Sequence, residues 1–247
     1  MQVTYLKMAS SRILKINKID LLIALDVMAI VASLLWLHHS NVDLKLQSYL
    51  FDFHLKSWMI DAKEPVKKFI FYDFPKIIFA IILAFCLFAA VVSFKKKSGF
   101  FVHNRHKFLI TLLGLALIPL IAGNIKKFTN IYCPSQLEIY GGEFRYVKIF
   151  EKYPVLNGVK IKSGQCFPAG HAVTGFALII LFFVLEKKVY RIFGLLGAVI
   201  IGWVLGFYQM AKGVHFFGDT LIAMLICFLI AAIITRIYEI WLAKSSN

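Results

Sequence analysis

Acidic residues are scarce in this 247-residue chain, which has 13 Asp and Glu against 28 Lys and Arg and a formal net charge of +15. The basic residues lie mostly between apolar runs, so anionic lipid headgroups are the expected partners and nucleic acid is excluded. The sequence also lacks internal repeats and low-complexity tracts, so we expect a single domain over residues 1–247. No cleavable signal peptide is recognised, and the first apolar run is expected to remain a membrane span.

Hydrophobic residues, by contrast, are abundant. They make up 60% of the chain, and phenylalanine alone contributes 24 residues. Soluble domains contain roughly 45–50% apolar residues. This excess is difficult to bury in one soluble core, so the composition predicts an integral membrane protein.

Six segments approach the roughly 20 apolar residues that a membrane-spanning helix needs. They predict an all-α, six-helix transmembrane bundle with spans at 19–37, 75–94, 108–123, 169–185, 192–208 and 217–234. Asp20 and Asp26 lie in the first span. Either they mark a proton path, or Asp20 lies at the interface and Asp26 faces neighbouring helices, which we favour.

Lysine and arginine cluster at the N-terminus, at 95–107 and at 187–191. Alternating spans place these clusters and the C-terminus on one side, which the positive-inside rule makes cytoplasmic. The opposite side receives the segments 38–74 and 124–168 and the turn 209–216. The first of these has a rough helical spacing of apolar residues, which fits either an interfacial amphipathic helix or an ordinary packed loop helix. We therefore expect a bacterial inner membrane protein with both termini cytoplasmic.

Three polar stretches, at 126–134, 166–171 and 209–219, meet on the outer side in this topology. In Pro168-Ala169-Gly170-His171, the glycine allows a close approach to the backbone at a helix start, where free N–H groups bind anions. A histidine there is more often an interface residue, but its context favours a functional role.

In the last stretch, His215 and Asp219 are four residues apart and share one helix face. A carboxylate bonded to one ring nitrogen leaves the other free to attack. The alternative is a structural histidine at a capped helix start. The first stretch supplies Lys126, which can bind a phosphoryl oxygen or act as a simple interface anchor.

In this order and spacing, the three stretches resemble the signature of the type 2 phosphatidic acid phosphatase family, which shares its site with vanadium haloperoxidases. The family pattern Lys-x6-Arg-Pro is matched by Lys126 and Cys133-Pro134, and Pro-Ser-Gly-His by 168–171. The pattern Ser-Arg-x5-His-x3-Asp is matched by 208–219. The resemblance implies that His215 is the nucleophile, Asp219 orients it, and His171 is the acid and base. No metal or cofactor is implied.

Both family arginines are absent, replaced by Cys133 and Gln209, and Ala169 stands where the family has serine. The resemblance extends to a divergent bacterial branch with Cys-Pro in the first motif and Cys-Phe-Pro in the second. An active variant is therefore favoured over a dead enzyme. The expected phosphate-binding residues are Lys126, Ala169, Gly170, Lys212, Gln209 and Arg145.

Cys133 and Cys166 lie beside this site on the outer side, and they form either a disulfide or two free thiols. An oxidising periplasm favours the disulfide. Cys86 and Cys227 fall in apolar runs and are expected to be inert packing residues.

The sequence thus predicts a lipid phosphatase with its site facing the periplasm and no obligate protein partner. The candidate substrates are lipid A, undecaprenyl diphosphate and phosphatidylglycerol phosphate, with a slight preference for lipid A of lipopolysaccharide. Two alternatives remain, a lipid phosphotransferase and a non-catalytic lipid-binding or transport protein on the same scaffold.

Overall fold

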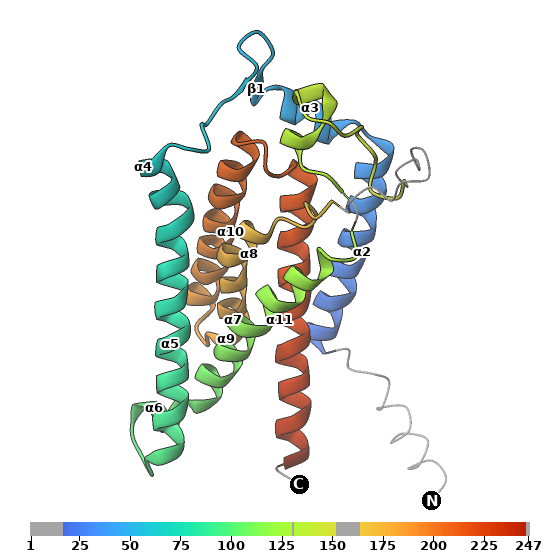
Figure 1. The fold of residues 1–247 in the computed structure, drawn as a ribbon. Coiled ribbons are helices and arrows are strands. Elements are labelled where there is room, and N and C mark those ends of the chain that lie inside the picture. Colours follow the sequence, from blue (N-terminus) through green and yellow to red (C-terminus); the bar gives the residue numbers. More distant parts are fainter. Residues whose placement is uncertain (1–16, 130, 152–163, 246–247) are drawn as a thin grey trace, which may run out of the picture.

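The computed structural model describes residues 17–129, 131–151 and 164–245, and it is all-helical apart from one short hairpin. Five helical segments are long and apolar enough to cross a membrane. They are α2 (Lys18–His39), the continuous segment Pro65–Lys95, α7 (Arg105–Ile125), α10 (Lys188–Ala211) and α11 (Phe217–Ser245). Five of the six predicted spans fall within these helices, which stand side by side in a bundle (Figure 1). The all-α prediction is therefore confirmed.

The second span begins ten residues earlier than the predicted start at position 75. Three helical pieces run on without a break: α4 (Pro65–Lys68), the π-helical turn η1 (Phe69–Asp73) and α5 (Phe74–Lys95). Charged residues on α4 and η1 reduce the local hydropathy, although the backbone there is already helical. This extension places Tyr72 within a helix instead of a loop.

The fourth predicted span, 169–185, is the exception. It is a shorter apolar stretch, Gly170–Val184, made of α8 (Gly170–Phe176), η4 (Ala177–Ile179) and α9 (Ile180–Val184). A Cβ on Gly175 would lie 2.5 Å from the backbone nitrogen of Gly202, so α8 and α10 pack backbone to backbone. This close packing encloses the stretch on most sides, and Val173, Phe176 and Ile180 are fully buried.

Outside the bundle, the segment after α2 forms α3 (Val42–Ser48) and a hairpin of β1 (Phe51–Asp52) and β2 (Ser57–Trp58). The short α3 packs against α11 and buries Gln47, whose side-chain amide donates to the Met210 carbonyl at 2.8 Å. For these seven residues, the packed-loop interpretation fits better than an interfacial helix.

The segment after α7 contributes two short turns, η2 (Pro134–Gln136) and η3 (Glu138–Tyr140). Together with the hairpin they form a cap at the end of the bundle opposite the start of α2 and the end of α11 (Figure 1). Phe51, Trp58 and Tyr140 hold the cap together through ring contacts.

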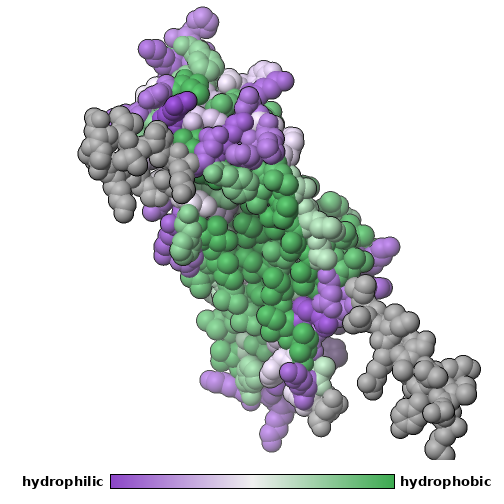
Figure 2. Space-filling model, turned by 90° about the vertical axis from the view of Figure 1, so that its right-hand side faces the viewer, coloured by the Kyte–Doolittle hydropathy of each residue, from purple (hydrophilic) through white to green (hydrophobic). Residues whose placement is uncertain are grey.

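The surface supports a membrane environment. Figure 2 shows apolar side chains over the middle of the molecule and hydrophilic ones toward its two ends. Ile81, Phe88 and Leu196, from the helices α5 and α10, are each at least half exposed, and large apolar patches of this kind mark a surface that contacts lipid. Asp20 pairs with Arg236 at 2.7 Å, while Asp26 is buried between helices, in line with the interpretation favoured above. Of the basic N-terminal residues, Lys7, Arg12 and Lys15 lie outside the described part of the chain, and Lys18 begins α2.

Candidate functional site

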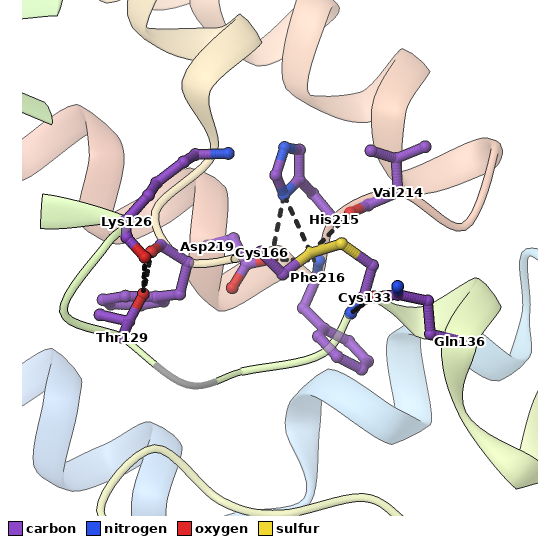
Figure 3. The surroundings of a disulfide bond; sticks show 10 residues. Lys126, Thr129, Cys133, Gln136, Cys166, Val214, His215, Phe216 and Asp219 are labelled. Carbon is purple, nitrogen blue, oxygen red and sulfur yellow. Dashed lines mark hydrogen bonds and ion pairs between the residues drawn. A yellow bond between two sulfur atoms is a disulfide. The ribbon is translucent and has the colours of Figure 1, made fainter. Parts of the chain in front are cut away.

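The His215–Asp219 pair is built by the turn between α10 and α11. The backbone turns at Gly213, whose φ of +71° is left-handed, and the Trp58 ring packs where a Cβ would be. His215 follows, and its Nδ1 lies 3.2 Å from Asp219 Oδ2 in the first turn of α11. The same oxygen accepts the Phe216 N–H at 2.9 Å. The carboxylate is thereby fixed, and it orients the imidazole so that Nε2 points away from it (Figure 3).

Burial of His215 decides its charge. Its side chain is nearly inaccessible, and this burial lowers the pKa of His215, while the Asp219 carboxylate opposes the shift. The imidazole is therefore neutral at neutral pH, as a nitrogen nucleophile must be.

The loop that leads into α8 is fastened to the other two stretches by hydrogen bonds. Cys166 N–H donates to the Ile131 carbonyl at 2.9 Å, and the Thr129 hydroxyl donates to the Phe167 carbonyl. The Ala169 N–H donates to the Asp219 carbonyl at 3.0 Å. These bonds bring the three sequence stretches together at one place, and they leave the Ala169 N–H already engaged.

Lys126 and Gly170 lie against each other. Lys126 is the C-cap of α7, and a Cβ on Gly170 would lie 3.3 Å from its Nζ. Its amine points toward the His215 imidazole (Figure 3). Burial lowers the pKa of Lys126, and the Asp219 charge opposes that shift. A cation next to a glycine backbone suits a phosphoryl oxygen.

Cys133 and Cys166 form a disulfide with their Cα atoms 5.1 Å apart (Figure 3). The bridge joins the first stretch to the second. Cys166 Sγ lies 3.4 Å from His215 Nδ1 and 2.7 Å from the Val214 carbonyl oxygen. The disulfide therefore also packs directly beneath the histidine.

Opening this disulfide is expected to destabilise the fold by about 2–4 kcal/mol. Because the bridge supports His215, we also expect activity to decrease. Thermal unfolding with and without reductant, and of the Cys133→Ser/Cys166→Ser double variant, measures the effect. A Cys86→Ala/Cys227→Ala variant is the control, since it should keep the reductant-sensitive Tm. Equal Tm values for reduced and oxidised wild type would contradict the prediction.

Of the remaining predicted phosphate-binding residues, Lys212 and Gln209 lie near the site and Arg145 does not. Lys212 Nζ lies 4.8 Å from the centre of the Tyr208 ring, and burial lowers the pKa of Lys212. Gln209 is buried, and its side-chain nitrogen has no partner among the described residues. Arg145 is exposed and forms no ion pair or hydrogen bond with the described residues, so the structure does not bring it into the cluster.

Sequence reasoning missed Tyr72, Lys76 and Asp43. The Tyr72 ring stacks on the His171 imidazole, with centroids 4.0 Å apart, and Lys76 Nζ lies 3.6 Å above the Tyr72 ring. Asp43 Oδ1 accepts the Gly218 N–H at 2.8 Å, from 175 residues away in sequence. The sequence contains one sign of these contacts, the four-residue spacing of Tyr72 and Lys76. That spacing predicts a shared helix face only if the helix begins before Tyr72.

Asp43 predicts a pH dependence of stability. Burial, and then the nearby Asp219 charge, raise the pKa of Asp43 from 3.8 to about 7. A carboxyl group with a raised pKa in the folded state contributes stability below its unfolded pKa and loses it as pH rises through the folded value. Asp43→Asn should therefore have a higher Tm than wild type at pH 8, and the gap should close toward pH 4.

Thermal unfolding across this pH range checks the prediction. Asp52→Asn is a suitable control, because two backbone N–H bonds lower the pKa of this exposed hairpin carboxylate and no gain at pH 8 is expected. An Asp43→Asn variant that follows wild type at every pH would rule out the raised pKa.

Cys166, His215 and Asp219 bring ligand atoms within 4.8 Å of one another, a spacing that suits a metal ion. The disulfide uses the Cys166 sulfur, however, and thiolate is the form that binds metal. The remaining donors are one imidazole and one carboxylate, fewer than the three protein ligands of a catalytic zinc site.

The comparisons with known proteins point the same way as the motifs. No curated protein and no solved structure matches the chain. The family model of the PAP2 superfamily matches residues 107–242, which include all three stretches, and confirms the resemblance found in the sequence.

Proposed function

Because the chain belongs to the PAP2 superfamily, we propose that it is a membrane lipid phosphatase that works through a phosphohistidine at His215. Members of this superfamily are phosphatases, which supports hydrolysis of a phosphate ester in general. The observation that carries the finer proposal is the buried His215–Asp219 pair, 3.2 Å apart, with His171 and Lys126 around it. A protein that only binds lipid has no need of this combination.

In the proposed first step, Nε2 of His215 attacks phosphorus while the bond to the leaving oxygen breaks. Asp219 keeps the other ring nitrogen protonated and stabilises the positive charge that develops on the ring. His171 gives its proton to the leaving oxygen, and the negative charge of the bound phosphate favours the protonated form that this requires.

In the second step, His171 takes a proton from water, and the water oxygen attacks the phosphohistidine. The P–N bond breaks, inorganic phosphate forms, and His215 returns to its neutral state. Lys126, Lys212 and the Gly170 backbone bind the phosphoryl oxygens as their charge increases. Neutral Gln209 lies in the same region, whereas Ala169 contributes only its place in the loop.

The rest of the proposal concerns the membrane. Residues 1–247 form one domain, with Gly170–Val184 as a sixth, shorter span beside the five longer helices. The termini lie in the cytoplasm of a bacterium and the site faces the periplasm, where a disulfide is stable. The substrate is a lipid phosphate, such as lipid A, undecaprenyl diphosphate or phosphatidylglycerol phosphate.

A substrate panel tests this function. Purified protein in detergent micelles is expected to release inorganic phosphate from at least one of these three lipids, and to do so in the presence of EDTA. Mass spectrometry of the lipids identifies the bond that is cleaved. Transfer of phosphate to a second lipid without release would show a phosphotransferase, and no reaction with any lipid would overturn the proposal.

A further inference from the structure

Three lysines from separate parts of the chain surround His171. Lys126 ends α7, Lys212 follows α10, and Lys76 lies in the first turn of α5. Lys76 Nζ and Lys212 Nζ lie 3.6 and 5.8 Å from the centre of the Tyr72 ring, which stacks on His171, and Lys126 Nζ lies beside Gly170, the residue before His171. Within the described residues, none of the three forms an ion pair. Asp219 is a carboxylate near Lys126, but no described carboxylate pairs with Lys76 or Lys212, so the three cations repel one another and the arrangement favours a bound anion.

The position of Lys76 is set by Tyr72. The two residues are four apart and share one face of the helix. The Tyr72 ring stacks on His171 with centroids 4.0 Å apart, and Lys76 Nζ lies 3.6 Å from the centre of the same ring. Lysines at the ends of membrane helices usually extend toward the headgroups. Lys76 instead lies over the ring that covers His171.

An apolar cavity lies beside this cluster of lysines. Residues of α5, of the stretch α8–η4 and of α10 line an apolar cavity of about 240 Å³, among them Phe79, Leu178 and Leu205. Lys76 and His171 lie closer to the cap than Phe79 and Leu178 do, and Lys212 follows the capped end of α10. Phe74 and Pro75 extend the apolar lining up to Lys76. Lys76 therefore stands where the phosphate of a lipid would meet its hydrocarbon chain.

The motif stretches alone leave the site short of positive charge. Cys133 and Gln209 occupy the positions of two arginines in the family pattern, and both are neutral here. Charge that develops on a phosphoryl group needs several cationic or N–H donors.

We propose that Lys76, held by Tyr72, binds a phosphoryl oxygen of the substrate and supplies cationic charge that the motif stretches lack. This inference rests on the proposed function, because it concerns the same site. Lys76 lies outside the three stretches and outside residues 107–242, so neither the motifs nor the family match assigns it a role.

Binding of inorganic phosphate, followed as the rise in Tm with phosphate concentration, tests Lys76 without any catalytic step. Lys76→Met is expected to raise the apparent Kd for phosphate roughly 10- to 100-fold, the range of one charge-assisted hydrogen bond. Lys76→Arg should recover most of the affinity because it keeps the charge. Lys67→Met is the matched control, since Lys67 lies on the adjacent α4 and pairs with Glu64 at 2.6 Å, and it should stay within about twofold of wild type.

The lipid substrates are then assayed with the same variants, and kcat/KM should decrease in Lys76→Met by a factor similar to the loss of phosphate affinity. If phosphate stabilises Lys76→Met as well as wild type, or stabilises neither, the proposal is overturned whatever the hydrolysis results are. If phosphate binding depends on Lys76 but no lipid is hydrolysed, the anion site stands and the phosphatase proposal fails.

Discussion

Replacing His215 with alanine is expected to reduce phosphate release by at least about 10³-fold, because the variant has no atom that can form the phosphohistidine. The loss should appear in kcat with every lipid substrate, since the nucleophile is common to all of them. Brief reaction with a ³²P-labelled lipid and denaturation in alkali, where phosphohistidine survives, should label wild type and leave the variant unlabelled.

An exposed histidine provides the control for this experiment. His103 lies in α6 (Phe100–His103), near the opposite end of the bundle, and His103→Ala should retain the wild-type rate. Asp219→Asn tests the orienting partner, and a large loss is expected because the charge is removed and the amide can hold the imidazole in the tautomer whose Nε2 carries the proton and cannot attack. A His215→Ala enzyme as active as wild type would show that the nucleophile is another residue.

Replacing His171 with alanine is expected to cost about 10²- to 10⁴-fold with alkyl phosphates, the usual contribution of a general acid. An alkoxide leaves poorly without a proton, whereas p-nitrophenolate leaves readily without one. The loss should therefore be much smaller with p-nitrophenyl phosphate than with a lipid phosphate, provided that expulsion of the leaving group limits the rate.

This difference between leaving groups separates acid catalysis from a structural role. His171 stacks under Tyr72, so its removal also disturbs the packing of η1. A packing defect would reduce both rates by the same factor and lower the Tm. Equal losses with both substrates would therefore rule out His171 as the acid.

Local patterns explain why the His215–Asp219 pair could be predicted from the sequence. Residues four apart share a helix face wherever that helix lies, so the spacing implies the contact. Lys126 and Gly170 can be predicted in a similar way, because Lys126 follows one apolar run and Gly170 begins another. The family pattern then assigned them roles that local spacing alone does not give.

Asp43 and Lys76 could not be found in this way, because their contacts depend on tertiary packing. Asp43 reaches Gly218 only because α3 folds onto α11, and no periodicity in the segment 38–74 indicates that contact. The predicted span 75–94 includes Lys76 near its start, but the direction of the Lys76 side chain depends on the Tyr72 ring and on the helical turn η1 before it. Hydropathy predicts which segments enter the membrane, but it does not predict which faces of the helices contact one another.

The short apolar stretch Gly170–Val184 has a mechanical consequence for the bilayer. At 1.5 Å per residue it is roughly 22 Å long, whereas the hydrocarbon core of a typical bilayer is about 30 Å thick. Longer helices enclose the stretch, so if it spans the membrane, water and headgroups must descend within the bundle to meet His171. This descent puts bond cleavage below the plane in which headgroups normally lie. A lipid that can sink, through a slender or flexible attachment between phosphate and chain, would then reach the histidines at the smallest elastic cost to the membrane.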